Sequence, residues 1–219
     1  MAEIKSVNEL LKMNINIPDY QRPYKWDIQN IEDLFLDITN AISDADRYRT
    51  EFKYRIGTII LHQTEDNTYD VVDGQQRIIS VVRIKQCSET DFECTILEKD
   101  FTNKISQYNI HRNYTFIKEW FSLKSDDVKE EYLHAFESIL EVVVVCVDKV
   151  TEAFQLFDSQ NTRGKALDPH DLLKAYHLRE MKKYPYEMKH AVTKWEAKDT
   201  GSIKELFDLY LFPIWNWSR

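Results

Sequence analysis

The spacing of apolar residues near the start of the chain predicts two helices joined by an irregular loop. Ser6 and Glu9 have the spacing of a helix capping box, so a short helix is expected to begin there. Over 28–42, apolar residues recur at every third or fourth position and Asp27 is available as the N-cap, which predicts an amphipathic helix. The intervening segment 17–26 holds two prolines, and their fixed φ predicts an irregular, aromatic-rich loop.

Runs of β-branched and apolar residues mark the expected strands. These runs lie at 56–61, 69–72, 92–97 and 142–147. The first two are separated by Glu65-Asp-Asn-Thr68, a composition typical of a hairpin turn. The polar residues of 78–85 do not alternate with apolar ones, so this segment is predicted to be a helix.

Further helices are expected in the second half of the chain. The sequence predicts them at 109–121, 125–140 and 151–160. Asp168 and Pro169 supply an N-cap and a first-turn proline for another helix, and Ser202 repeats the capping-box spacing before 206–211. The chain is therefore expected to combine helices and strands.

The composition fits a folded soluble protein. The 219 residues are 43% hydrophobic and 30% charged, which excludes a disordered or collagen-like chain. This length corresponds to roughly one to one and a half domains of about 150 residues. The 29 basic and 37 acidic residues give a net charge of −8, so no general positive potential is expected to hold nucleic acid.

The cysteines and the apolar runs indicate a cytoplasmic protein. Cys87, Cys94 and Cys146 have no paired spacing, so neither a disulfide framework nor a zinc site is expected, and they are interpreted as small core residues. The longest apolar run, at 142–147, is far shorter than the ~20 residues of a membrane-spanning helix. No membrane segment is expected.

The segment Asp73-Gly-Gln-Gln-Arg77 follows an expected strand and opens an expected helix, which makes it the first candidate site. The unpaired N–H groups and the dipole at a helix N-terminus favour an anion, and Gly74 lets the backbone approach it. Arg77 offers a planar fork for a phosphate, Gln75 and Gln76 can donate and accept hydrogen bonds, and Asp73 could hold Mg²⁺. The alternative is a hairpin turn with Arg77 in a surface salt bridge.

Two other segments have both a functional and a structural interpretation. The donor-rich loop Asn161-Thr-Arg-Gly-Lys165 is either a second phosphate clamp or a helix C-cap whose basic residues interact with the dipole. Tyr20, Tyr24 and Trp26 either stack on a nucleobase, with Arg22 as a hydrogen-bond donor, or seal an edge of the core.

The order of these motifs resembles one known family. The chain carries, in order, I-P-x-Y-Q-R-x-Y-x-W at 17–26, G-x-I at 57–59, V-V-D-G-Q-Q-R at 71–77, N-x-R-G-x-x-L at 161–167 and D-L-L-K at 171–174. This order resembles domain-of-unknown-function family 262, the N-terminal half of GmrSD-type modification-dependent restriction enzymes, which also occurs in SspE-like anti-phage proteins. The resemblance extends from Ile4 to about Leu178.

The resemblance implies a fold and a set of site residues. The fold would be α/β (α+β), with a ParB/sulfiredoxin-like small mixed sheet, flanking helices and a helical C-terminal extension. A nucleotide-binding domain would occupy 1–180, and 181–219 would begin a truncated or partner-binding region. By position, the catalytic residues would be Asp73, Gln75, Gln76 and Arg77, and the nucleotide-binding residues would be Gln21, Arg22, Gly74, Arg77, Asn161, Arg163 and Lys174.

One position departs from the family pattern. Family members usually carry a hydroxyl residue two places after the motif arginine, whereas this chain has Ile79 there and Ser80 one place later. The nearest hydroxyl to the family position is therefore that of Ser80.

The function that follows from the resemblance is regulatory. The chain would be a cytoplasmic NTP-binding and hydrolysing domain, with Mg²⁺ as cofactor, of a type IV restriction or anti-phage defence protein. Its partners would be a nucleoside triphosphate, DNA and an HNH-type nuclease domain or subunit, and it could form a homo-oligomer. No HNH-like motif follows Leu178, so the chain is not expected to cut DNA by itself. A non-catalytic DNA-sensing module that uses the same loop on a DNA phosphate, and a small-molecule phosphotransferase, remain open alternatives.

Overall fold

The computed structural model describes most of the N-terminal two thirds of the chain and scattered positions after it. The described residues are 2–19, 21–48, 52–64, 66, 68–148, 187, 190, 191, 194, 195, 198, 200–206 and 209. The chain divides into two compact units, the first made of 1–17 and 23–153 and the second of 18–22 and 154–219. The helices predicted at 151–160 and after Asp168 lie outside the described residues.

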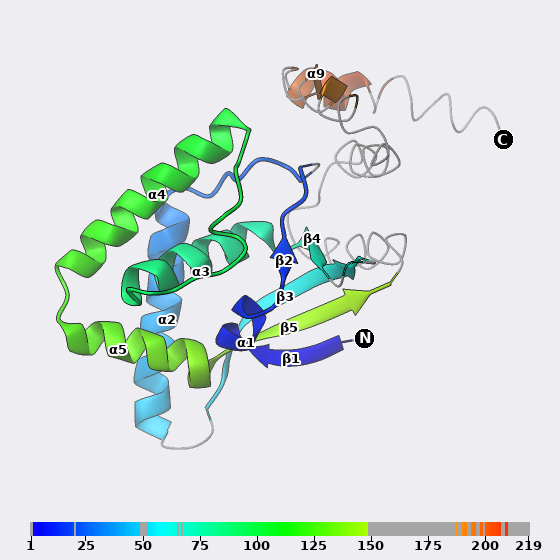
Figure 1. Cartoon of the computed structure of the whole chain (residues 1–219). Helices are drawn as coiled ribbons and strands as arrows, with labels where there is room; N and C mark the ends of the chain where they lie inside the picture. Colours follow the sequence, from blue (N-terminus) through cyan, green and yellow to red (C-terminus); the bar gives the residue numbers. More distant parts are fainter. Residues whose placement is uncertain are drawn as a thin grey trace. The chain divides into compact units, whose positions relative to one another are not determined.

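A five-stranded mixed sheet forms the centre of the first unit, in the order β1-β5-β3-β4-β2 (Figure 1). The strands are β1 (Ala2–Ser6), β2 (Ile15–Asn16), β3 (Tyr54–Gln63), β4 (Tyr69–Asp73) and β5 (Leu140–Val147). Strand β5 runs parallel to β3 and antiparallel to β1, whereas β4 is antiparallel to β3 and parallel to β2. Together with its helices, this sheet confirms the expected α+β class.

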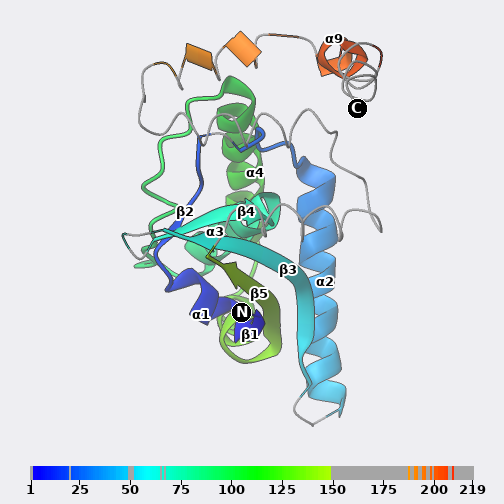
Figure 2. The ribbon, with the colours of Figure 1, turned by 90° about the vertical axis from the view of Figure 1, so that its right-hand side faces the viewer.

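The helices of the first unit gather beside this sheet. They are α1 (Val7–Leu11), α2 (Ile28–Tyr48), α3 (Gln75–Ser88), α4 (Lys104–Ser122) and α5 (Asp126–His134). In Figure 1, α2 to α5 lie together on one side of the sheet, and the turned view of Figure 2 shows β3, β4 and β5 in front of α3. The second unit contains the short helix α9 (Thr200–Glu205).

An aromatic cluster joins three of these helices within the core. Its members come from α2, α4 and α5, and are Phe35, Phe116, Trp120, Phe121 and Tyr132. The Phe35 ring stacks on Trp120 with centroids 4.2 Å apart. The Tyr132 hydroxyl is 2.9 Å from the Thr39 hydroxyl, so the polar atom of this buried ring has a partner.

The predicted start signals for α1 and α2 are confirmed. Glu9 N donates to Ser6 Oγ over 3.1 Å, and Ser6 N donates to Glu9 Oε2 over 2.7 Å, which completes the capping box. At α2, Asn30 N donates to Asp27 Oδ1 over 3.3 Å. Both helices begin where side-chain oxygens satisfy N–H groups that the helix leaves unpaired.

The strand predicted at 92–97 is wrong, because this segment forms turns. Leu97 N donates to Cys94 O over 3.0 Å, and the Thr95 hydroxyl donates to Ile15 O over 2.7 Å. Ile96 is buried in the core, and three other residues of the segment pack against that core, namely Phe92, Cys94 and Leu97. The apolar residues of this segment therefore anchor a turn rather than a paired strand.

Two other boundaries differ from the sequence prediction. The helix expected at 125–140 ends at His134 and continues as a π-helical turn at Ala135–Ile139, after which β5 begins at Leu140. Helix α9 begins at Thr200, so Ser202 lies inside the helix and not at its N-cap. None of the described helices combines the length and apolar character needed to cross a bilayer.

The three thiols are expected to react slowly with alkylating reagents. Cys87, Cys94 and Cys146 are free and half-buried, and burial raises the pKa of each, that of Cys87 to about 11. Since the thiolate is the reactive form, iodoacetamide at pH 7.5 should label the native protein more slowly than it labels the chain unfolded in urea. Mass spectrometry checks this, and equal rates in the two states would contradict it.

Candidate functional site

The D-G-Q-Q-R segment lies where β4 ends and α3 begins. Asp73 is the last residue of β4, and Gly74 is the N-cap of α3 with φ 91° and ψ 7°. Gly74 O accepts the helix hydrogen bond from Ile78 N over 3.0 Å, and no side chain caps the first turn. The predicted turn from a strand into a helix is confirmed, and no side-chain cap in the described part of the chain occupies the first-turn N–H groups.

Only a glycine fits at position 74. A Cβ atom on Gly74 would collide with Ile59 Cδ1 in the neighbouring strand β3 and would lie 3.4 Å from Thr58 O. The left-handed φ adds a second reason, because residues with a Cβ rarely adopt it. The turn therefore lies directly against the backbone of β3.

A second glycine, Gly57, makes room for the arginine of the motif. The pairing of β3 with β5 shifts register between Arg55 and Thr58, and Gly57 in this bulge has φ 132°. A Cβ there would lie 2.7 Å from Arg77 Cζ and 2.8 Å from Nη1. The guanidinium thus rests on the bare backbone of the bulge, where Arg77 Nη1 donates to Thr58 O over 3.3 Å.

The Arg77 guanidinium is a partly desolvated cation. Burial lowers its pKa, and the charge of the nearby Asp73 carboxylate offsets part of that shift. Within the described residues no carboxylate forms an ion pair with Arg77. A buried cation without such a partner is stabilised by any anion that reaches it.

Gln76 ties the D-G-Q-Q-R segment to the aromatic loop at 23–26. Its Oε1 accepts hydrogen bonds from Lys25 N (2.8 Å) and Trp26 N (3.1 Å), and its Nε2 donates to Pro23 O over 3.2 Å. The side-chain amide is occupied by backbone groups, so in this structure it acts as a positioning group. Sequence reasoning missed this contact, since the two segments are fifty residues apart.

The side chain of Tyr24, which belongs to this loop, points into the core. It is 1% exposed, and its hydroxyl contacts Ser80 Oγ at 2.7 Å and accepts from Asn113 Nδ2 at 3.0 Å. Burial raises the pKa of this hydroxyl. The expectation that the Tyr24 ring stacks on a base does not agree with this burial, whereas the alternative, that it seals the core, does. Ser80, the displaced hydroxyl of the family pattern, serves here as the partner of Tyr24.

The chain can now be compared with known protein families. A family model described as the N-terminal domain of the GmrSD restriction endonuclease matches residues 7–178, which is 172 of the 219 residues. The chain belongs to this family. A second model, described as a family of unknown function (DUF7834), matches residues 187–219. A search of curated proteins gave no match.

Membership of the GmrSD N-terminal domain family confirms the resemblance drawn from the motifs. The matched range contains the aromatic loop, the strand with Gly57 and the D-G-Q-Q-R segment. The chain is therefore part of a restriction or defence protein.

The remaining predicted site residues of this GmrSD N-terminal domain differ in burial and in the unit to which they belong. Gln75 is 5% exposed, and its Oε1 is buried without a hydrogen-bond partner in the described part of the chain. Trp26 is half-buried against the core. Gln21 and Arg22 belong to the second unit. The other predicted residues, Tyr20, Asn161, Arg163 and Lys174, lie outside the described residues.

Replacing Gln76 by alanine is expected to lower the melting temperature by about 6–12 °C, taking the central value of ~1 kcal/mol for each hydrogen bond lost. Three hydrogen bonds of about 0.5–1.5 kcal/mol each disappear, and a domain of this size loses about 2–4 °C for each kcal/mol. The matched control is Gln29→Ala, since Gln29 is exposed and makes a single bond, to Asp33. Circular dichroism measures both, and equal melting temperatures would contradict the positioning role of Gln76.

Proposed function

We propose that this chain is the NTP-binding and NTP-hydrolysing regulatory domain of a modification-dependent restriction or anti-phage defence protein. In this role it gates a separate HNH-type nuclease domain or subunit in response to DNA, in the cytoplasm. The observation that carries the proposal is the Arg77 guanidinium, which lies on the Gly57 bulge next to the uncapped start of α3. Family membership supplies the restriction context.

The geometry supports a phosphate ligand in particular. The first-turn N–H groups of α3 and the Arg77 guanidinium come from one turn of helix, so a single anion can contact both. Guanidinium groups bind phosphate oxygens through paired, charge-assisted hydrogen bonds. Gly74 allows the turn that begins α3, and Gly57 leaves the space that the Arg77 guanidinium occupies, so both donors are held in place before a ligand arrives.

Asp73 fits a Mg²⁺ ion that arrives with the nucleotide. Magnesium commonly uses one or two carboxylates together with phosphate oxygens, and Asp73 is held in place by its pairing with Ile60 in the sheet. Among the described residues no group of three or more metal-ligating side chains occurs, so a metal site made by protein alone is not the proposal. The ion would neutralise charge on the phosphates.

Steady-state release of phosphate from GTP, ATP and CTP with Mg²⁺ tests this function. We expect turnover of at least one nucleotide, and a loss of about tenfold to a hundredfold in Arg77→Ala, because a charge-assisted hydrogen bond contributes about 1.5–3 kcal/mol. Asp73→Ala should lose turnover as well. The matched control is Arg55→Ala, since Arg55 lies exposed on β3, where its Nε is 3.7 Å from Glu141 Oε2.

Three results would contradict the proposal. Turnover that Arg77→Ala retains at the level of Arg55→Ala would place the chemistry elsewhere. Salt-dependent DNA binding that needs Arg77, with no turnover of any nucleotide, would instead support the DNA-sensing alternative. A phosphorylated acceptor among the products would indicate a phosphotransferase.

A further inference from the structure

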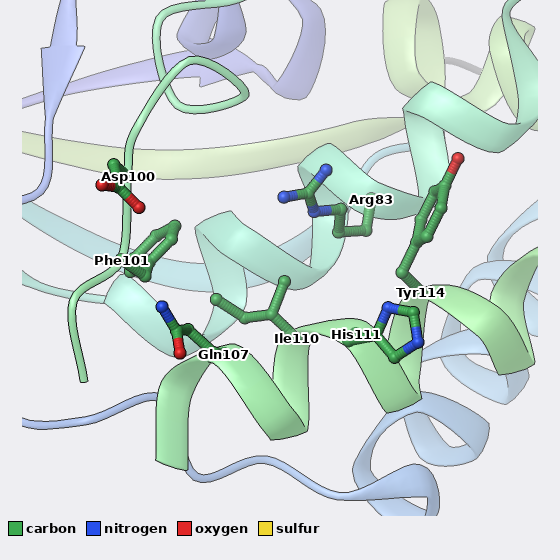
Figure 3. A pocket seen from close by; sticks show the side chains of 7 residues that line it. All are labelled: Arg83, Asp100, Phe101, Gln107, Ile110, His111 and Tyr114. Carbon is green, nitrogen blue, oxygen red and sulfur yellow. The ribbon is translucent and has the colours of Figure 1, made fainter. Parts of the chain in front are cut away.

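A pocket of about 250 Å³ lies between α3, α4 and the turn segment that joins them (Figure 3). It is separate from the D-G-Q-Q-R segment. Its basic residue, Arg83, follows Arg77 by six positions on α3, which is about 9 Å along the helix axis at 1.5 Å per residue.

The guanidinium of Arg83 enters this pocket, and no carboxylate in the described part of the chain forms an ion pair with it. Its Nη1 donates to Gln86 Oε1 over 2.8 Å, and its Cζ lies 5.5 Å from the centroid of the Tyr114 ring. Its Nε is buried and has no hydrogen-bond partner among the described residues. Burial lowers the pKa of the guanidinium, so its positive charge is incompletely compensated.

Flat and apolar groups surround that charge. In Figure 3, Phe101 lies on one side of Arg83 and Tyr114 on the other, and Ile110 lies between them. Aromatic faces of this kind bind planar rings by stacking. The pocket therefore offers a cation and aromatic surface to the same ligand.

The polar residues at the rim of the pocket restrict which ligands can bind. Gln107, His111 and Asp100 line the pocket and are exposed. The Asp100 carboxylate disfavours ligands that carry more negative charge than a single phosphate group, and it can accept hydrogen bonds from amino groups. The volume, below the ~300–1,000 Å³ of pockets for drug-sized ligands, has room for one ring system and one anionic group.

We propose that this pocket binds a nucleoside monophosphate, or a smaller heteroaromatic carboxylate that offers the same pair of a planar ring and an anionic group. Arg83, beside Tyr114, pairs with the anionic group, the base lies against Phe101, and the neighbouring Asp100 accepts a hydrogen bond from an amino group of the base. The inference does not rest on NTP hydrolysis at Arg77, because the two arginines lie in different surroundings.

Isothermal titration calorimetry on the full chain tests the site. The probes are AMP, GMP, CMP and nicotinate, compared with adenosine, which lacks the charge, and inorganic phosphate, which lacks the ring. We expect at least one monophosphate or nicotinate to bind. Adenosine and inorganic phosphate should each bind at least about tenfold more weakly, because each lacks one set of contacts.

Variants assign the binding to this pocket. Arg83→Gln should weaken it by about tenfold to a hundredfold. The matched control is Arg112→Gln, since Arg112 is also half-buried, lies 5.5 Å from an aromatic centroid, that of Tyr108, and has a buried, unpartnered Nε, but does not line the pocket. Gln107→Glu changes an exposed residue of the rim, and the added negative charge should weaken the binding of an anionic ligand several-fold.

The outcomes separate this site from the one at Arg77. Binding that persists in Arg77→Ala and falls in Arg83→Gln and Gln107→Glu supports the pocket. Binding lost only in Arg77→Ala, equal binding of adenosine, or no heat with any probe would overturn the proposal.

Discussion

Replacing Phe35 by alanine is expected to lower the free energy of unfolding by about 3–5 kcal/mol. The side chain is 4% exposed and its ring contacts four other aromatic rings on two helices, so the substitution removes stacking and leaves a cavity among stiff side chains. Proteins are stable by about 5–15 kcal/mol in total, so this loss removes a large share of the stability.

Urea unfolding followed by circular dichroism measures this effect. The neighbouring residue Leu36 supplies the control, because it lies on the same helix but is 61% exposed, and Leu36→Ala should stay within about 0.5 kcal/mol of the wild type. Phe35→Leu should fall between the two. Similar midpoints for Phe35→Ala and Leu36→Ala would show that the cluster contributes little.

Replacing Gly74 by alanine is expected to destabilise the protein by about 2–6 kcal/mol and to abolish phosphate release. The left-handed φ of 91° contributes about 1–3 kcal/mol, and the collision of the new Cβ with Ile59 Cδ1 contributes a further ~1–3 kcal/mol. Since the same backbone presents the first-turn N–H groups, relief of the strain would misplace the donors of the proposed phosphate site.

A second substitution separates the two causes. Ile59→Val removes the Cδ1 atom with which the new Cβ collides. The double variant Gly74→Ala/Ile59→Val should therefore lose less free energy of unfolding than the two single variants lose in total. The backbone strain should remain in the double variant. Strict additivity in thermal unfolding would show that no collision occurs. Gly201→Ala, at an exposed helical position in α9, serves as the control.

Local signals predicted the elements that have strong local causes. Helix α2 has an apolar stripe and an N-cap at Asp27, and the turn at Gly74 has a residue type that its backbone requires. Strand β1 has an exposed Ile4 and a mostly polar sequence, so its strand character comes from pairing with β5 and not from its own pattern.

The site was predicted in its parts but not in its assembly. The sequence showed a glycine in G-x-I and an arginine in D-G-Q-Q-R, and only the bulge of β3 brings Gly57 and Arg77 together. The hydrogen bonds from Gln76 to the loop at 23–26 likewise depend on the packing of α3. No periodicity or propensity encodes such long-range contacts.

The strand order has a consequence for synthesis on the ribosome. Strand β5 lies between β1 and β3, so the first strand to be made cannot pair until residues 140–147 have emerged, more than 130 residues later. Contacts that span so much chain form slowly, and until then β3 has an open edge that can pair with another chain. Chaperones that bind nascent chains should therefore engage this protein before Val147 leaves the exit tunnel.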